Sequence, residues 1–344
     1  MPTVPIRFTS GDVTLVGELA LPVGAGPNPA VVLLHGSTWA ERRFYRAHSQ
    51  AFVGAGIATF SFDRRGNGES GGERDMNVEV LAADAVSAWK AVCVAGGVDA
   101  GRVGVWGYSN GAWVAGLAAS RLPQAAFLVL VGASGVTPAE AEVYRRSAAL
   151  RAQGISEDTL AVVARTWTIF FDYCAHGVWD ASWDGELASL QERLSADESL
   201  AALPVSPLVR DFPQFDPVPH LERPPGNRLR AEMGGALPEM AYDPVPALER
   251  VRCPVLAVLA ENDQNLPVPE SVARFETVAA GRSPGAFQIE VLESADHLFS
   301  ANGEGADDSH LRPRDAADFR PGFLEMMADW MAERTGADEA RQSP

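Results

Sequence analysis

The sequence predicts an α/β domain with a mostly parallel central sheet, interrupted by a helical insertion. Short apolar runs alternate with helical patterns over the first part of the chain, an order that right-handed crossover connections produce. The alternation stops after Ser134 and resumes at Cys253. We therefore expect a core of residues 1–134 and 245–335, a helical insertion over 135–244 and a frayed tail over 336–344.

Each strand is expected where apolar residues run together. Residues 13–21 alternate between apolar and polar, which is typical of a half-exposed strand, whereas "AVVLLHG" at 30–36 is continuously apolar, which is typical of a strand buried on both faces. Further strands are predicted at 57–63, 102–109, 125–134, 253–263 and 286–294. Helical spacing predicts helices at 44–56, at 78–96, from Asn110 onward and at 322–335, which flank the sheet.

The insertion reads as helices without a convincing buried strand. Helical patterns cover 137–153, 156–177 and 184–200, and a proline-rich stretch from Leu203 to Pro225 predicts irregular coil. We expect this insertion to form a cap over the site described below.

Composition excludes several classes of protein. The formal net charge of −17 disfavours binding to a phosphate backbone, and no apolar run approaches the ~20 residues that a membrane helix needs. The three cysteines are far apart, so we expect no disulfide framework or zinc site, and a reducing cytoplasm as the compartment. The sequence contains no phosphate loop, metal cluster or dinucleotide fingerprint, so we expect no metal and no cofactor.

The pattern G-x-S-x-G occurs twice, around Ser70 and around Ser109. A nucleophile on this pattern needs a strand before it and a helix that begins at once after it. Ser109 has both neighbours in "RVGVWGYSNGAWVAGLAAS", whereas Ser70 lies in the polar loop "DRRGNGESGGERD". We therefore predict Ser109 as the nucleophile and Ser70 as a turn residue.

A serine nucleophile needs a base, and the base needs a carboxylate. His297 follows the last predicted strand in "VLESADHLF", at the carboxyl end of the sheet where ligands of open α/β folds bind. Asp263 ends the strand "CPVLAVLAEND" at the same edge, with Glu261 and Asp296 as alternative acids. The predicted triad is Ser109, Asp263 and His297.

An oxyanion formed at this serine needs amide donors. The backbone N–H of Asn110, directly after the nucleophile, is one candidate. The second is the N–H of Ser37, in the loop after "VVLLHG". An ordinary glycine turn at Gly36 is the alternative for the second position.

With these motifs the chain resembles the α/β-hydrolase superfamily, and most of all its dienelactone-hydrolase-like and prolyl-oligopeptidase-like (S9-type) bacterial branch. The segments that carry the resemblance are "AVVLLHGS", "FDRRGNGESGG", "VGVWGYSNGAW", "CPVLAVLAENDQNLPV" and "SADHLF". The resemblance implies the α/β-hydrolase fold with the order Ser, Asp, His along the chain. Relatives often carry an acidic residue after the nucleophile, where this chain has Asn110, and that departure disfavours a simple peptidase.

The function expected from these residues is that of a serine hydrolase (EC 3.1), cleaving a small to medium, apolar ester or thioester through an acyl-enzyme. The alternatives are an acyltransferase or cyclase with a non-water acceptor, a peptidase or amidase, and, least favoured, a non-catalytic binding module. We expect a monomer or homodimer that binds neither nucleic acid nor membrane. Candidate residues of the substrate pocket are Trp39, Tyr45, Tyr108, Trp167, Phe170 and Phe171, although the last three also suit a core of the insertion.

Overall fold

The computed structural model describes residues 1–24, 26–37, 41–176, 180–196, 238–302 and 313–337. The chain divides into two compact units, one made of Met1–Val136 and Asp243–Pro344 and the other of Thr137–Tyr242. These divisions lie two residues from the predicted ones. The predicted coil from Leu203 to Pro225 and the tail beyond Ala337 lie outside the described residues.

The first unit is built on an eight-stranded sheet in the order β1-β2-β4-β3-β5-β6-β7-β8. β1 pairs with β2, and β2 with β4, in antiparallel fashion. Every other pairing is parallel, which confirms the mostly parallel sheet that the sequence predicts. The strands are β1 (Thr3–Ser10), β2 (Val13–Ala20), β3 (Asn28–Leu34), β4 (Ala58–Phe62), β5 (Val98–Tyr108), β6 (Leu128–Val131), β7 (Val255–Ala260) and β8 (Phe287–Leu292). The carboxyl ends of the parallel strands therefore lie along one edge.

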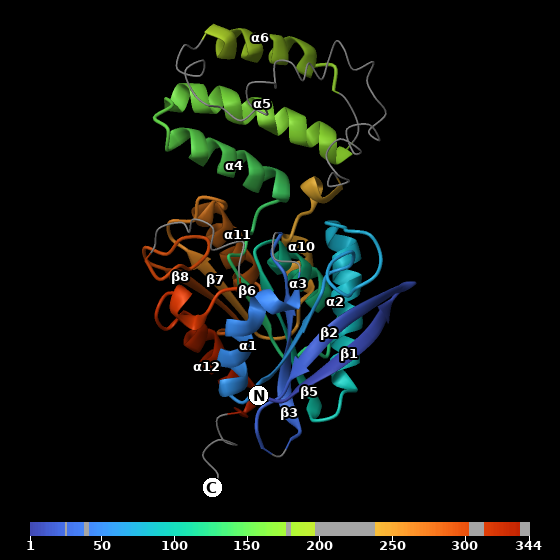
Figure 1. Cartoon of the computed structure of the whole chain (residues 1–344). Helices are drawn as coiled ribbons and strands as arrows, with labels where there is room; N and C mark the ends of the chain where they lie inside the picture. Colours follow the sequence, from blue (N-terminus) through green and yellow to red (C-terminus); the bar gives the residue numbers. More distant parts are fainter. Residues whose placement is uncertain (25, 38–40, 177–179, 197–237, 303–312, 338–344) are drawn as a thin grey trace. The chain divides into compact units, whose positions relative to one another are not determined.

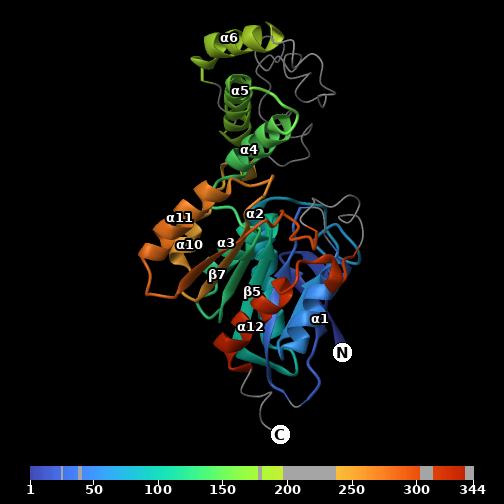
Figure 2. The same cartoon turned by 90° about the vertical axis from the view of Figure 1, so that its left-hand side faces the viewer.

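Helices cover both faces of this sheet (Figures 1 and 2). On one face lie α1 (Arg46–Gly54) and α12 (Phe323–Thr335), which contact each other. The other face carries α2 (Val78–Cys93), α3 (Asn110–Ser120), α10 (Val245–Arg250) and α11 (Val268–Ala280). Short 3-10 turns, η1 (Arg42–Tyr45) and η4 (Ala316–Asp318), complete the described elements of this unit.

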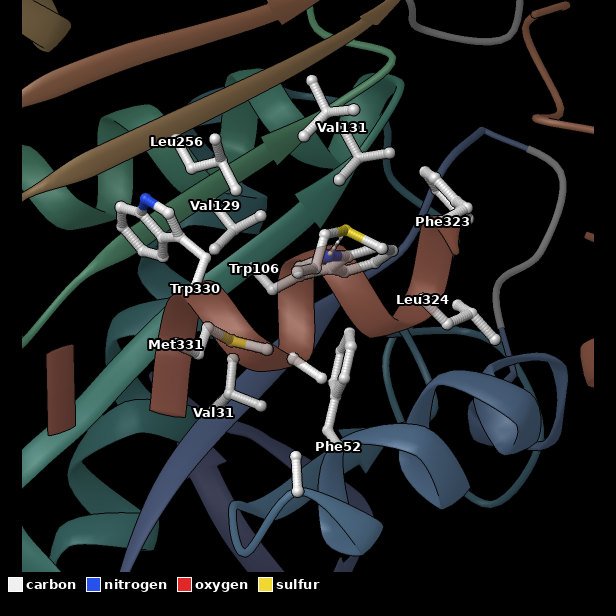
Figure 3. Close-up of a cluster of buried hydrophobic side chains, with 14 of the residues drawn as sticks. Val31, Phe52, Trp106, Val129, Val131, Leu256, Phe323, Leu324, Trp330 and Met331 are labelled. Carbon is white, nitrogen blue, oxygen red and sulfur yellow. Dashed lines mark hydrogen bonds between the residues drawn. The ribbon is translucent and has the colours of Figure 1, made fainter. Parts of the chain in front are cut away.

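The core between the sheet and α12 is aromatic and aliphatic (Figure 3). Trp106 of β5 is fully buried there, and its Nε1–H lies 3.4 Å from the sulfur of Met327. β6 and β7 are buried along their whole length, which explains why their sequences run apolar without alternation.

The second unit contains α4 (Pro138–Arg151), α5 (Glu157–His176), α6 (Trp183–Ala196) and the turn η2 (Pro238–Ala241). Thr137 and Glu140 form a capping box that starts α4. The predicted helices at 137–153 and 156–177 match α4 and α5 closely. The apolar face of α5 is buried, with Trp167, Phe170 and Phe171 in one cluster.

Three of the described strands and helices are missing from the sequence-based prediction: β1, the six-residue helix α10 and α11. β1 is an edge strand whose residues are mostly exposed and which contains a proline, so its apolar signal is weak. α11 begins directly after Pro267 and buries only a few of its side chains, among them Phe275 and Val278.

The turn from β5 into α3 is tight. Ser109 has a φ of 54° and a ψ of −121°, a conformation that costs free energy for a residue with a side chain. A Cβ at Gly107 would lie 2.0 Å from the Gly111 carbonyl oxygen, and a Cβ at Gly111 would lie 2.5 Å from the Leu34 oxygen. Glycine is therefore required on both sides of Ser109.

We predict that Gly111→Ala destabilises the protein by about 1–3 kcal/mol or more, because its methyl group would collide with backbone atoms of β3. Gly116→Ala on the same helix is the matched control: the nearest atom to its Cβ is the movable Leu248 Cδ2 at 3.1 Å, and alanine favours the helix by about 1 kcal/mol. Urea unfolding measures both variants. Equal free energies of unfolding would contradict the prediction.

The ring of His48 in α1 is buried between Trp106 and Phe319, with centroid distances of 5.0 Å to each. Burial, with a smaller contribution from the Arg314 charge, lowers the pKa of His48 from 6.5 to about 3. The unfolded chain therefore binds a proton at this side chain between these two values, while the folded protein does not. The buried, neutral His48 therefore makes its full contribution to the free energy of unfolding above pH 6.5, and this contribution is lost as the pH falls toward 3.

We expect the free energy of unfolding of His48→Phe to fall less steeply below pH 6.5 than that of the wild type, by up to about 1.4 kcal/mol per pH unit. Urea titrations at pH 4.5, 5.5, 6.5 and 7.5 would measure the slopes. Parallel slopes in the two proteins would mean that His48 is solvated or protonated in the folded state.

Candidate active site

Three side chains from distant parts of the chain meet at the carboxyl edge of the sheet. The Ser109 Oγ lies 3.0 Å from His297 Nε2, and His297 Nδ1 lies 2.6 Å from Asp263 Oδ2. These are the three residues that the sequence analysis selects, and Ser109, Asp263 and His297 follow β5, β7 and β8 respectively. Such a relay can move a proton from the serine to the imidazole.

Asp263 is positioned by the turn after β7. Its carboxylate is buried, and its Oδ1 accepts hydrogen bonds from the N–H groups of Asn265 at 2.8 Å and Leu266 at 3.1 Å. These two bonds fix the carboxylate so that Oδ2 faces the imidazole. The two alternative acids accept backbone N–H groups and not the imidazole. The Glu261 carboxylate accepts the N–H of Ser294 at 2.7 Å, and the Asp296 carboxylate accepts the N–H of Ser300 at 2.8 Å.

The segment that carries His297 is held by Tyr108, the residue before the serine. The Tyr108 hydroxyl donates to the His297 carbonyl oxygen at 3.0 Å, and the two rings lie 5.5 Å apart. Burial, followed by the Asp263 charge, raises the pKa of Tyr108 well above its usual value, so the phenol stays a donor. Tyr108 is buried, and this contact makes it a support of the histidine segment.

Gly132, which the sequence analysis does not single out, provides space for the imidazole. It directly follows β6 and has a φ of 53°, and a Cβ there would lie 3.3 Å from His297 Cε1. The signal in the sequence is a glycine directly after the buried run "FLVLV".

The two predicted oxyanion donors lie on neighbouring segments. Asn110 is the first residue of α3, where a helix leaves its backbone N–H groups without intrahelical partners. Ser37 is exposed and lies three residues after the end of β3. The close approach of Gly111 to the carbonyls of Leu34 and His35 brings these segments together.

The predicted pocket residues are packed in cores or lie outside the described residues. Tyr45 is buried, and its hydroxyl accepts the N–H of Gly36 at 3.0 Å. Trp39 lies outside the described residues. In the helical unit, Trp167 stacks on Phe171 with centroids 5.6 Å apart, and Phe170 packs edge-on against both. These contacts give the rings structural roles, and a pocket role for them stays a prediction.

A family model described as serine aminopeptidase, S33, matches residues 25–297 of the chain. Among curated proteins, the chain is similar to an Escherichia coli protein described as an uncharacterized 31.7 kDa protein in the traX-finO intergenic region. The two are 26% identical over 293 residues, which cover 83% of this chain and 88% of the relative.

Solved structures show the same fold at low sequence identity. The α/β-hydrolase GrgF from Penicillium sp. sh18 is 17% identical, with a TM-score of 0.58 over 98% of this chain and 100% of that one. The proline iminopeptidase of Mycobacterium smegmatis is 15% identical, with a TM-score of 0.55 over 97% of this chain and 100% of that one. The Pyrococcus furiosus esterase Pf2001 is 15% identical, with a TM-score of 0.54 over 97% of this chain and 92% of that one.

These comparisons confirm the superfamily and the fold that the sequence predicts. They do not address the narrower resemblance to the dienelactone-hydrolase-like and S9-type branch, which stays a prediction. The match spans most of the chain, from the glycine-rich turn before β3 to His297 itself. The chain therefore belongs to the serine aminopeptidase S33 family of the α/β-hydrolase superfamily, a family of hydrolases.

Proposed function

We propose that this protein is a serine hydrolase that cleaves a carboxylic ester or thioester through an acyl-enzyme. The observation that carries the proposal is the continuous relay from Ser109 Oγ through His297 to Asp263, with distances of 3.0 and 2.6 Å. The strained backbone at Ser109 adds support, because strain of this kind is concentrated at functional sites.

In the proposed reaction, His297 Nε2 accepts the hydroxyl proton as Ser109 Oγ attacks the acyl carbon. Asp263 keeps Nδ1 protonated and stabilises the positive imidazolium. The backbone N–H groups of Asn110 and Ser37 donate to the oxyanion of the tetrahedral intermediate. The imidazolium then protonates the leaving alcohol or thiol as the acyl–oxygen or acyl–sulfur bond breaks. Water next attacks the acyl carbon while His297 accepts its proton. The bond between the acyl carbon and Ser109 Oγ then breaks, the imidazolium returns a proton to Oγ, and the carboxylic acid leaves.

A second candidate is an aminopeptidase or amidase, which the description of the family favours. The same triad serves both reactions, and the difference lies in the leaving group. An acyltransferase or cyclase would again use the triad, with an alcohol or amine in place of water. We propose a small-molecule substrate of small to medium size and apolar character, with no membrane or nucleic-acid partner.

The compartment and assembly are also proposals. Among the described residues Cys93, Cys174 and Cys253 form no disulfide, which fits a reducing compartment such as the cytoplasm. Among the described helices, none combines the length and apolar character needed to cross a bilayer. We propose a monomer or homodimer as the working form.

The first test is covalent labelling with a fluorophosphonate, read by intact-protein mass. We expect one adduct on the wild type, none on Ser109→Ala, and one on Ser70→Ala. Ser70 is the matched control because its Oγ donates to the Asp63 carbonyl at 2.6 Å and accepts the Val16 N–H at 2.9 Å. Both bonds hold the loop in place, and the hydroxyl has no base beside it among the described residues.

Turnover of p-nitrophenyl esters of rising chain length, beside aminoacyl p-nitroanilides, would separate esterase from aminopeptidase activity. Product masses would reveal transfer to an acceptor other than water. An unlabelled wild type, or an adduct that survives in Ser109→Ala, would overturn the assignment of the nucleophile.

The acid is tested by a pair of variants. Asp263→Asn should lower kcat by a factor on the order of 10³–10⁴, because an amide cannot hold the imidazole in the required tautomer. Glu261→Gln should keep kcat within a few-fold, since among the described residues the Glu261 side chain binds only the backbone N–H of Ser294. A large loss in Glu261→Gln with little loss in Asp263→Asn would reassign the carboxylate.

A further inference from the structure

A buried guanidinium lies behind the loop that follows β3. Arg64, just after β4, is 4% exposed. Its Nη2 donates to the carbonyl oxygens of both His35 and Gly36, each at 2.8 Å, and its Nη1 lies 3.2 Å from the sulfur of Met76. Among the described residues, no carboxylate lies at ion-pair distance from Arg64.

The next residue in the chain makes the contrast clear. Arg65 forms two hydrogen bonds to the Asp84 carboxylate, at 2.8 and 2.6 Å, the usual way to compensate a partly buried arginine. Arg64 is more deeply buried and is compensated by carbonyl dipoles and a thioether. Burial lowers the pKa of Arg64 to about 10, so the guanidinium remains charged at neutral pH.

The bonds of Arg64 fix two successive peptide groups. In the peptide between His35 and Gly36, the oxygen is bound by Arg64 and the N–H by the Tyr45 hydroxyl at 3.0 Å. In the peptide between Gly36 and Ser37, the oxygen is again bound by Arg64. Three of the four polar groups are thus occupied, and the fourth is the N–H of Ser37, for which the described residues offer no acceptor.

The geometry of the peptide group determines the direction in which the Ser37 N–H points. In a trans peptide the C=O and the N–H point in opposite directions. An arginine that binds the Gly36 oxygen from inside the fold therefore turns the Ser37 N–H away from itself. A charged donor on the carbonyl also polarises the amide and strengthens the hydrogen bond that its N–H can donate.

We propose that Arg64 is a positioning residue of the oxyanion hole, which aims and polarises the Ser37 N–H toward the negative charge that develops on the substrate. The inference rests on the proposed function, because it takes Ser37 N–H as an oxyanion donor. Its distinctive consequence is kinetic. An interaction that strengthens only as the oxyanion forms lowers the barrier without tightening substrate binding, so its loss reduces kcat and leaves KM unchanged.

The test compares Arg64→Gln, Arg64→Lys and Arg65→Gln. For each folded protein, the experiment measures kcat and KM on a p-nitrophenyl ester, the rate constant of Ser109 phosphonylation by a fluorophosphonate, and the thermal midpoint. Arg65→Gln is the matched control, because it removes a neighbouring guanidinium that binds Asp84 and not the β3 loop.

We expect Arg64→Gln to lower kcat and the phosphonylation rate about 10–100-fold with KM within threefold, since removal of a whole oxyanion donor costs roughly 10²–10³. Arg64→Lys keeps the charge but loses the planar fork, and should fall between Arg64→Gln and the wild type. Arg65→Gln should lower the thermal midpoint and keep kcat within threefold.

The proposal is overturned if kcat is unchanged in Arg64→Gln, if KM rises while kcat is kept, or if Arg65→Gln loses as much kcat. Should Arg64→Gln fail to fold, Arg64→Lys decides, and a wild-type kcat in that variant overturns the proposal. These outcomes are distinct from failure of the proposed function, in which the wild-type protein itself is neither labelled at Ser109 nor active on the esters. That last result would overturn both.

Discussion

The candidate active site depends on one close contact between backbones, the approach of the first turn of α3 to the end of β3. A side chain at Gly111 has no room there, because the carbonyl oxygens of Leu34 and His35 occupy the space. Gly107 is equally crowded on the other side, and Ser109 between the two glycines has a positive φ. The absence of a side chain at Gly111 thus allows the start of α3, with Ser109 and the N–H of Asn110, to lie next to the segment that leads to Ser37.

The parallel sheet supplies the remaining order. Parallel strands end on the same side, so residues that follow β5, β7 and β8 converge although they are far apart in the chain. Local backbone bonds then fix each side chain: two amides hold Asp263, and Tyr108 holds the carbonyl of His297. The candidate site is therefore formed by short turns that follow the carboxyl ends of parallel strands.

The parallel part of the sheet and the meeting of Ser109, Asp263 and His297 could be predicted because their signals are local. Continuous apolar runs indicate buried strands, and a glycine-flanked serine between a strand and a helix indicates a sharp turn. β1 gives a weak signal, since an exposed edge strand with a proline lacks a marked apolar pattern. Gly132 and Arg64 are not singled out by the sequence, and Tyr108 is predicted only as a pocket residue, because each supports the site through a contact between segments that only the fold brings together. Tyr45 looks like a pocket residue by its position after the loop, and only its burial and its bond to Gly36 show where its ring lies.

The position of the helical unit in the chain has a consequence for how the protein folds. β6 and β7 pair side by side, yet the whole of Thr137–Tyr242 separates them in the chain. Closing a long flexible loop costs conformational entropy that grows with the logarithm of its length. An inserted unit that has already folded behaves as a single fixed span and lowers that cost. During synthesis the helical unit also emerges before β7 does. The order of translation therefore favours folding of the insertion first and the pairing of β7 and β8 with the six earlier strands afterwards.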